Sequence, residues 1–246
     1  MAQTQRKTAE SDGSTDEGEI TIEQYAARLR SQMARILEVQ GEITDQGVLR
    51  ALKDVPRHTF LPTGSLYRLL YDPRQVVQVA PELGVSLSEP YLMAQMLQEL
   101  QVKPGQRVLE VGTGMGYNAA LLANIVGPTG SVVTVEVQPE VAPIAQDNLV
   151  RLGITNVTVI HGDGHEGYMP NAPYDRIIAT AAATHLPPAL YEQLDPEGRM
   201  VIPLGLPDQP QGLFLEQKGH APLITSLGSV GFHPMVSPEA LSPIEV

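Results

Sequence analysis

Four short β-branched runs alternate with helix-like segments between residues 107 and 194, and this alternation restricts the fold more than any other feature. The runs read RVLEV, SVVTVEV, NVTVI and YDRIIAT, and helical patterns cover residues 119–125, 139–152 and 186–194. Strands that alternate with helices pair in parallel, and the helices then cover both faces of the sheet. The sequence therefore predicts a doubly wound, mostly parallel α/β sheet that binds its ligand at the carboxyl ends of the strands.

The rest of the chain extends this core on both sides. Residues 1–19 hold no Val, Ile, Leu or aromatic residue, so we expect a disordered tail there. Residues 20–246 are expected to form a single domain, in which residues 20–100 supply cover helices and a substrate loop. Residues 101–246 then supply the ligand-binding core. Three extended pieces beyond Gly198 predict an antiparallel edge of the sheet.

The helix starts in the first hundred residues have recognisable signals. Apolar residues at helical spacing predict a helix over residues 20–40, and a second helix is expected after a cap at Thr44 or Asp45. Pro90 predicts the start of a third helix, because proline is favoured in the first helical turn.

Charge and composition argue against several classes of function. The chain carries 28 acidic and 16 basic side chains, for a formal charge of −12, which disfavours a nucleic-acid partner. It has no cysteine, so disulfides, thiolate zinc sites and cysteine nucleophiles are excluded. None of the six histidines forms a pair at metal-ligand spacing, and no metal is predicted. Since no apolar run is long enough to span a membrane, we expect a cytoplasmic protein without membrane contact, and we take a monomer as the default.

The stretch GTGMGY follows the first of the four strands directly. Its glycines are Gly112, Gly114 and Gly116, whereas the dinucleotide fingerprint needs its third glycine where Tyr117 stands. Glycines at such a turn allow close approach of the backbone to a ligand. Glu110 precedes the loop and no lysine lies in it, so nothing would neutralise a pyrophosphate. The loop is better suited to a ligand that carries an amino group, a sulfonium and a ribose.

Two further acids follow the next two strands. Glu136 ends SVVTVE, where its carboxylate could accept hydrogen bonds from both hydroxyls of a ribose. Asp163 follows the third strand, where it could accept from an adenine amino group. Each feature also has a plain structural interpretation: an ordinary glycine turn, a solvent-facing Glu136 and a turn residue at Asp163. Their occurrence together after successive strands favours an adenosine-containing ligand.

With their flanks, these segments resemble the protein-L-isoaspartate O-methyltransferases, which have the Rossmann-like fold of S-adenosylmethionine-dependent methyltransferases. In chain order the similar blocks are VPRHTFLP, SLSEPYLMAQML, VLEVGTGMGYNAALLA, GDG, PYDRIIATAAA, LPPALYEQLDPEGRMVIPLG and GSVGFHPM. They cover most of the chain between Tyr25 and Met235. Many methyltransferases share the glycine block, whereas the two blocks upstream of it are much more specific.

The resemblance implies both a reaction and a set of site residues. The reaction is transfer of a methyl group from S-adenosyl-L-methionine to the side-chain carboxylate of L-isoaspartyl, and by extension D-aspartyl, residues in damaged proteins. It leaves S-adenosyl-L-homocysteine and leads through a succinimide to repair. The residues expected to bind the cofactor are Glu110, Gly112, Thr113, Gly114, Gly116, Glu136, Asp163 and Gly164.

Ser88 corresponds to the serine that the family places against the substrate carboxylate, which makes it the expected catalytic residue. A carboxylate is ionised at neutral pH and needs no general base, so the enzyme mainly has to align two reactants and exclude water. A neutral hydroxyl can orient the nucleophile without quenching it. The alternative interpretation of Ser88 is a helix N-cap.

The substrate side is expected to include Val85, Ser86, Tyr91, Ala181 and Ala182. The small residues after the fourth strand leave room for a peptide, and the Asn/Asp-Pro-Pro-Tyr/Phe element of amino-methylating enzymes is absent there.

Around Ser88 the chain also departs from the family. Val85 and Ser86 stand where the family has Gln and Thr, and Glu89 stands where it has Gln. An alternative function is therefore methylation of a normal aspartate in one dedicated precursor peptide, which would form an aspartimide. A third alternative, from another class, is a catalytically silent adaptor that binds S-adenosylmethionine.

Overall fold

The computed structural model describes residues 20–61, 67–207, 209–219 and 223–241. The tail predicted for residues 1–19 lies outside the described residues. Within the described ranges, no helix is both long enough and apolar enough to cross a membrane.

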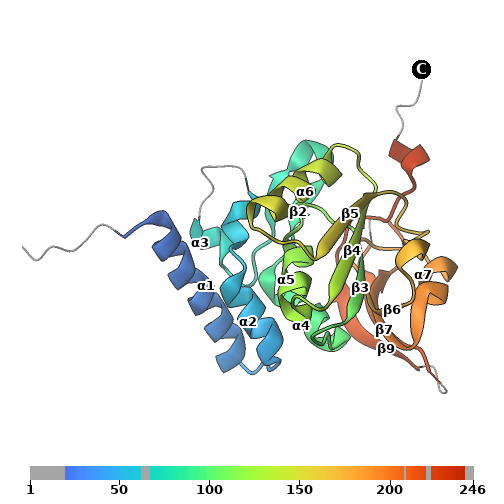
Figure 1. The fold of residues 1–246 in the computed structure, drawn as a ribbon, viewed down its shortest axis with the longest axis horizontal. Helices are drawn as coiled ribbons and strands as arrows, with labels where there is room; N and C mark the ends of the chain where they lie inside the picture. Colours follow the sequence, from blue (N-terminus) through green and yellow to red (C-terminus); the bar gives the residue numbers. More distant parts are fainter. Residues whose placement is uncertain (1–19, 62–66, 208, 220–222, 242–246) are drawn as a thin grey trace, which may run out of the picture.

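A seven-stranded sheet forms the centre of the molecule, in the order β5-β4-β3-β6-β7-β8-β9 (Figure 1). The strands are β3 (Arg107–Val111), β4 (Ser131–Glu136), β5 (Val157–His161), β6 (Tyr174–Ala179), β7 (Leu194–Leu204), β8 (Gln211–Gln217) and β9 (Leu223–Val230). Strands β3 to β7 pair in parallel, and β8 runs antiparallel to both β7 and β9. The mostly parallel sheet with an antiparallel edge is therefore confirmed. From β3 the strand order proceeds to β4 and β5 on one side, and the chain then returns to place β6 on the other side of β3. In such folds, ligands bind at the carboxyl ends of the two strands where the order changes, here β3 and β6.

Alternate residues of the parallel strands enter two separate apolar cores. Val108 and Ile178 belong to the core on one face, whereas Leu109 and Ile177 belong to the core on the other. Strands that are apolar on both faces need helices on both sides. The helices of the α/β core are α5 (Tyr117–Val126), α6 (Val141–Arg151) and α7 (Pro188–Gln193).

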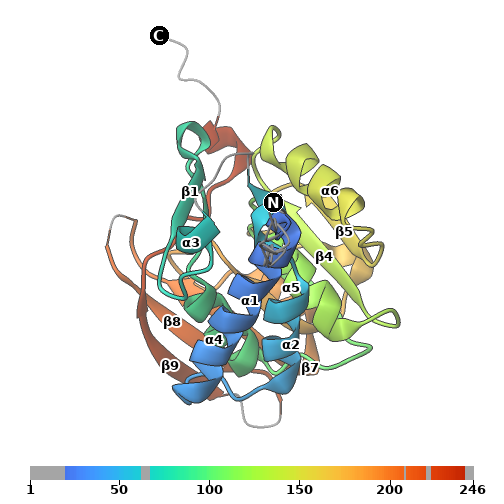
Figure 2. The same ribbon diagram turned by 90° about the vertical axis from the view of Figure 1, so that its left-hand side faces the viewer.

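The N-terminal helices add layers to the face that α5 covers. They are α1 (Ile22–Val39), α2 (Gln46–Asp54), α3 (Tyr67–Leu70) and α4 (Pro90–Leu100), with short 3₁₀ turns at η1 (Arg57–Phe60) and η2 (Pro81–Leu83). Two further 3₁₀ turns lie outside this region: η3 (Met169–Asn171) precedes β6 and η4 (Pro238–Leu241) follows β9. Helix α2 contacts α4 and α5, and α1 packs on α2, so α1 is outermost (Figure 2). The prediction of cover helices is confirmed.

Local signals define where these helices begin. A capping box joins Thr21 and Gln24 at the start of α1, and the Asp45 side chain accepts from the first backbone amides of α2. Helix α4 begins at Pro90, as predicted. Its N-cap is Glu89, whose side chain makes no capping hydrogen bond. Ser88 is therefore not the helix cap, and the alternative interpretation of this residue is wrong.

A small antiparallel hairpin precedes α4 and carries Ser88 at its end. Strands β1 (Val77–Ala80) and β2 (Val85–Leu87) form this hairpin, with Gly84 in the left-handed conformation at its turn. In Figure 2 the hairpin stands beside the chain that follows β9. Gly84 indeed lies next to His233. The hairpin and the C-terminal segment thus form two neighbouring walls.

Candidate active site

A cavity of about 1000 Å³ opens at the carboxyl ends of β3 and β4. One side is formed by the glycine loop, Glu136 and Gly164, and the other by the hairpin, the start of α4 and the segment after β9. Among the described residues that line it, none is lysine or arginine, and the two carboxylates are Glu89 and Glu136. The cavity therefore disfavours phosphate groups and suits a ligand with positive charge.

The glycine loop is held in its shape by a strand neighbour. Gly112 has φ +93°, and a Cβ there would lie 2.6 Å from Thr180 Oγ1. The Thr180 hydroxyl donates to the Gly112 carbonyl at 2.5 Å. A side chain at Gly112 would therefore break this contact. Above Gly114, a Cβ would meet nothing closer than Val85 Cγ1 at 3.9 Å, so this backbone faces open cavity space.

Glu136 is only 6% exposed and faces the cavity from the end of β4. The Gly114 amide donates to Oε2 at 2.8 Å, and the Gln138 amide donates to Oε1 at 3.1 Å. Each carboxylate oxygen can accept a further hydrogen bond, so both remain able to bind hydroxyl groups of a ligand. The solvent-facing interpretation of Glu136 is wrong.

Glu110 lies beneath the loop instead of in the cavity. It is fully buried, and its carboxylate accepts from Asn118 Nδ2 at 2.8 Å and from Thr134 Oγ1 at 2.5 Å. The Thr113 and Thr134 hydroxyls are 2.7 Å apart, which extends this network into the loop. Burial raises the pKa of Glu110 to about 7, although these hydrogen bonds oppose the increase. Glu110 supports the loop from below, and its position does not favour the predicted direct contact with a cofactor.

Three other predicted residues also lie outside the cavity lining. Asp163 Oδ1 accepts from the His165 amide at 2.8 Å, so the side chain closes a local turn. Burial alone would raise the pKa of Asp163, but hydrogen bonds from Ser237 and His165 outweigh it and the pKa is lowered. Gly116 packs against α6, and Ala182 pairs with the backbone of residues 233–235. Asp163 thus closes a turn, and direct contact of Asp163, Gly116 and Ala182 with a ligand stays a prediction.

The other predicted residues do line the cavity. They are Gly112, Thr113, Gly114, Glu136 and Gly164 on one side, and Val85, Ser86, Ser88, Tyr91 and Ala181 on the other. Gly164 packs so closely that a Cβ there would lie 2.4 Å from Val111 Cγ1. The structure thus brings the glycine loop and Ser88 to one cavity from segments that are far apart in the sequence.

The sequence analysis missed the wall that the C-terminal segment forms. Residues 229–236 line the cavity, and Thr180 also belongs to its lining. The block GSVGFHPM belongs to this segment, but nothing local in it indicates a site. Its one useful signal was glycine: Gly228 adopts φ +120°, and β8 and β9 shift register close to it. Elsewhere among the described residues, no three His, Asp or Glu side chains gather as metal ligands would.

The sheet order, the glycine loop after β3 and the acid at the end of β4 together define the S-adenosylmethionine-dependent methyltransferase fold. The family model of protein-L-isoaspartate(D-aspartate) O-methyltransferases matches residues 28–240. The chain belongs to this family.

Relatives and solved structures agree with this assignment. Protein-L-isoaspartate O-methyltransferase 1 of Archaeoglobus fulgidus is 43% identical over 80% of this chain and 89% of its own length. The protein-L-isoaspartate O-methyltransferase of Methanothermobacter thermautotrophicus is 39% identical over 84% and 94%. A solved protein-L-isoaspartate O-methyltransferase superposes with a TM-score of 0.79 at 31% identity, over 85% of this chain and 66% of that chain. The fold is also that of a Plasmodium falciparum structure titled as a putative protein-L-isoaspartate O-methyltransferase in complex with S-adenosyl-L-homocysteine (TM-score 0.72, 24% identity, 84% and 98% covered).

Proposed function

We propose that this protein transfers a methyl group from S-adenosyl-L-methionine to the side-chain carboxylate of L-isoaspartyl residues in damaged proteins and peptides. One observation carries the proposal: a single cavity is lined by the glycine loop, by Glu136 and by Ser88, whose hydroxyl has no hydrogen-bond partner among the described residues. A cofactor site and an acceptor site that share one cavity support group transfer between their ligands. Family membership supports the choice of acceptor.

The cavity residues fit this cofactor. The cofactor carries positive charge, and the described residues that line the cavity include two carboxylates and no lysine or arginine. The Glu136 oxygens are placed to accept from ribose hydroxyls, while the open backbone at Gly114 leaves room for close approach. Asn118 belongs to the cavity lining, and its buried Oδ1 atom has no hydrogen-bond partner among the described residues, so an acceptor is left over next to the site. Bound there, the cofactor supplies an activated methyl group.

The acceptor side needs orientation more than acid–base catalysis. An isoaspartyl carboxylate is ionised at neutral pH, so no residue has to remove a proton. The Ser88 hydroxyl can donate to one carboxylate oxygen and leave the other free for in-line attack on the methyl carbon. The hairpin and the segment after β9 line this position, so a peptide bound between them would displace water from it.

After transfer, the chemistry proceeds without further catalysis. Methoxide leaves a methyl ester more easily than hydroxide leaves an acid when the neighbouring amide nitrogen attacks. The ester therefore closes to a succinimide, which opens by hydrolysis to aspartate or isoaspartate. Repeated rounds enrich normal aspartate.

Paired peptides test the proposal. Two short peptides that differ only in aspartate or isoaspartate at one position are incubated with enzyme and radiolabelled cofactor, and volatile methanol is measured. We expect label on the isoaspartyl peptide alone. If isoaspartyl peptides stay unlabelled while an aspartate in one partner peptide is labelled, the repair function is wrong and methylation of a dedicated peptide is supported. Calorimetric binding of cofactor without any methyl transfer would identify a silent adaptor.

A further inference from the structure

Arg57, from the block VPRHTFLP, is a buried cation for which the reaction described above has no use. Its side chain is 0% exposed. Its Nη2 donates to the Ser88 carbonyl at 2.7 Å and more weakly to the Leu87 carbonyl at 3.4 Å, and Nε donates to the Leu70 carbonyl at 3.0 Å. Among the described residues, no carboxylate forms an ion pair with it.

A charge without a carboxylate partner is costly to bury. Burial lowers the pKa of Arg57, and the nearby hydroxyls of Tyr117 and Tyr71 counteract this only in part. Backbone carbonyls therefore provide most of the compensation. An apolar residue of similar length would pack here without the desolvation cost. Stability alone therefore does not explain why this position holds an arginine.

The contacts of Arg57 connect the two halves of the active site. Its guanidinium carbon lies 4.8 Å from the centroid of the Tyr117 ring, and Tyr117 is the first residue of α5 after the glycine loop. On its other side it binds the backbone of Ser88, at the junction of β2 and α4. Within the part of the chain that the structure describes, the Ser88 hydroxyl has no hydrogen-bond partner. The position of that hydroxyl therefore depends on its backbone, and Arg57 holds this backbone from behind.

We propose that Arg57 is a positioning residue for methyl transfer: it sets the place of the Ser88 backbone relative to the cofactor loop. The inference rests on the proposed function. A planar guanidinium can bind several carbonyls in fixed directions while it stacks on a ring, and a lysine ammonium cannot do both. Alignment of the two reactants is the main contribution of this enzyme. Loss of the Arg57 guanidinium therefore lowers turnover more than it lowers the affinity for the cofactor.

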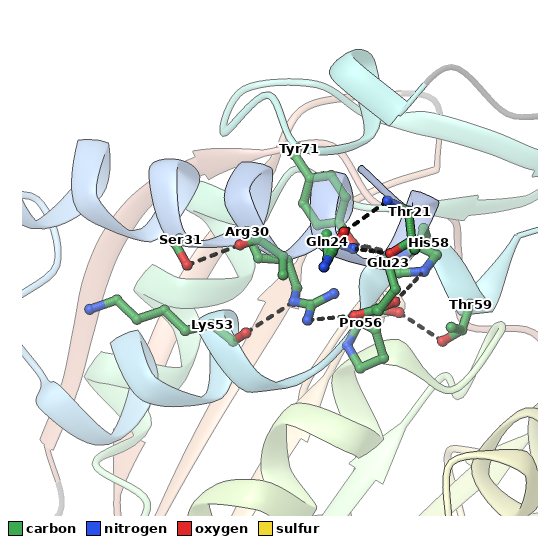
Figure 3. Close-up of polar contacts among 11 residues, drawn as sticks. Thr21, Glu23, Gln24, Arg30, Ser31, Lys53, Pro56, His58, Thr59 and Tyr71 are labelled. Atoms are coloured by element: carbon green, nitrogen blue, oxygen red, sulfur yellow. Dashed lines mark hydrogen bonds and ion pairs between the residues drawn. The ribbon is translucent and has the colours of Figure 1, made fainter. Parts of the chain in front are cut away.

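Arg30 provides a matched control, because it is a second buried arginine in the same N-terminal layers. It is 7% exposed, and Figure 3 shows its guanidinium bonded to the Lys53 carbonyl and to Glu23. Neither Arg30 nor these two partners line the cavity. Arg30 also hydrogen-bonds Tyr71 but does not bind the Ser88 backbone, so its substitution reports the cost of losing a buried arginine that does not hold that backbone.

The experiment compares Arg57→Lys and Arg57→Met with Arg30→Lys and Arg30→Met. For each variant, kcat and KM on an isoaspartyl peptide are measured well below the melting temperature, together with the dissociation constant of S-adenosyl-L-homocysteine. We expect kcat to fall about 100-fold in Arg57→Met and about 10-fold in Arg57→Lys, with cofactor affinity changed by less than about threefold. Both Arg30 variants should keep kcat within about twofold of the wild type, whatever their melting temperatures.

Equal kcat values per folded molecule in the Arg57 and Arg30 variants would overturn the inference. So would a loss of cofactor affinity that accounts for the whole loss of turnover. If Arg57→Met does not fold, Arg57→Lys decides by the same criteria. An inactive wild-type enzyme would overturn the proposed function, and this inference with it.

Discussion

Glu110 should make the stability of this protein depend on pH in an unusual direction. Burial raises its pKa from 4.5 to about 7 in the folded state, so between these values the folded protein binds a proton that the unfolded chain releases. Stability must then fall as the pH rises through this window. Carboxylates that form ion pairs have the opposite effect. Replacing Glu110 by Gln removes the titration while keeping the shape of the side chain.

The size of the effect follows from the shift. A difference from 4.5 to about 7 corresponds to a total of about 3 kcal/mol in the free energy of unfolding. About 2 kcal/mol of this lies between about pH 5.5 and about pH 8, a range that avoids precipitation near the isoelectric point. The chain has a sequence pI of about 4.9, so the lower limit stays above it.

Urea unfolding of the wild type and of Glu110→Gln at several pH values measures this difference. Titrating groups that do not interact with Glu110 contribute equally to both proteins, so only the difference between their two stability curves is interpreted. We expect the wild type to lose about 2 kcal/mol relative to Glu110→Gln from low to high pH. Parallel curves would show that Glu110 has an ordinary pKa in the folded protein and would contradict this reasoning.

Three further predictions concern the cavity. Glu136→Gln should weaken binding of S-adenosyl-L-methionine about 10- to 100-fold by calorimetry, because it loses charge-assisted hydrogen bonds of about 1.5 to 3 kcal/mol; an unchanged dissociation constant would contradict the ribose assignment. Ser88→Ala should lower kcat about 10- to 100-fold with little change in cofactor affinity, and full turnover would remove Ser88 from the mechanism. Glu89 lines the cavity next to Ser88, so isoaspartyl peptides with a neighbouring lysine should be methylated up to about threefold more efficiently than those with glutamate. Glu89→Gln should abolish that preference. An unchanged ratio of the efficiencies for the lysine and glutamate peptides would show that Glu89 does not cause it.

The path of the chain was largely predictable because its signals are local. The alternation of β-branched runs and helical patterns depends on residues within one element. The same holds for the start of α2 after its cap Asp45 and for the start of α4 at Pro90. Gly112 was recognisable because its positive φ is a property of the turn itself. Glu136 could be placed at the ligand edge of the sheet because it is the last residue of a strand pattern, which is also a local signal.

Which of these residues face the ligand was decided by the tertiary structure. Glu110 is the penultimate residue of β3 and Asp163 follows β5, at the same edge as Glu136, yet Glu110 turns into the core and Asp163 closes a local turn. Alternation along β3 places Glu110 on one face of the sheet, but its partner Thr134 comes from the neighbouring strand β4. A strand pattern does not specify how the side chain of Asp163 turns after β5 has ended.

The contacts that join the site span even greater distances along the chain. Arg57 reaches Ser88 across 31 positions, and the segment after β9 forms a wall for a loop that begins at Gly112. Hydrophobic periodicity and capping describe interactions within a few residues, so the sequence by itself determined the elements and their order. The burial of Arg57 and the pKa of Glu110 arise only when distant segments exclude water together, and these were properties of the folded protein alone.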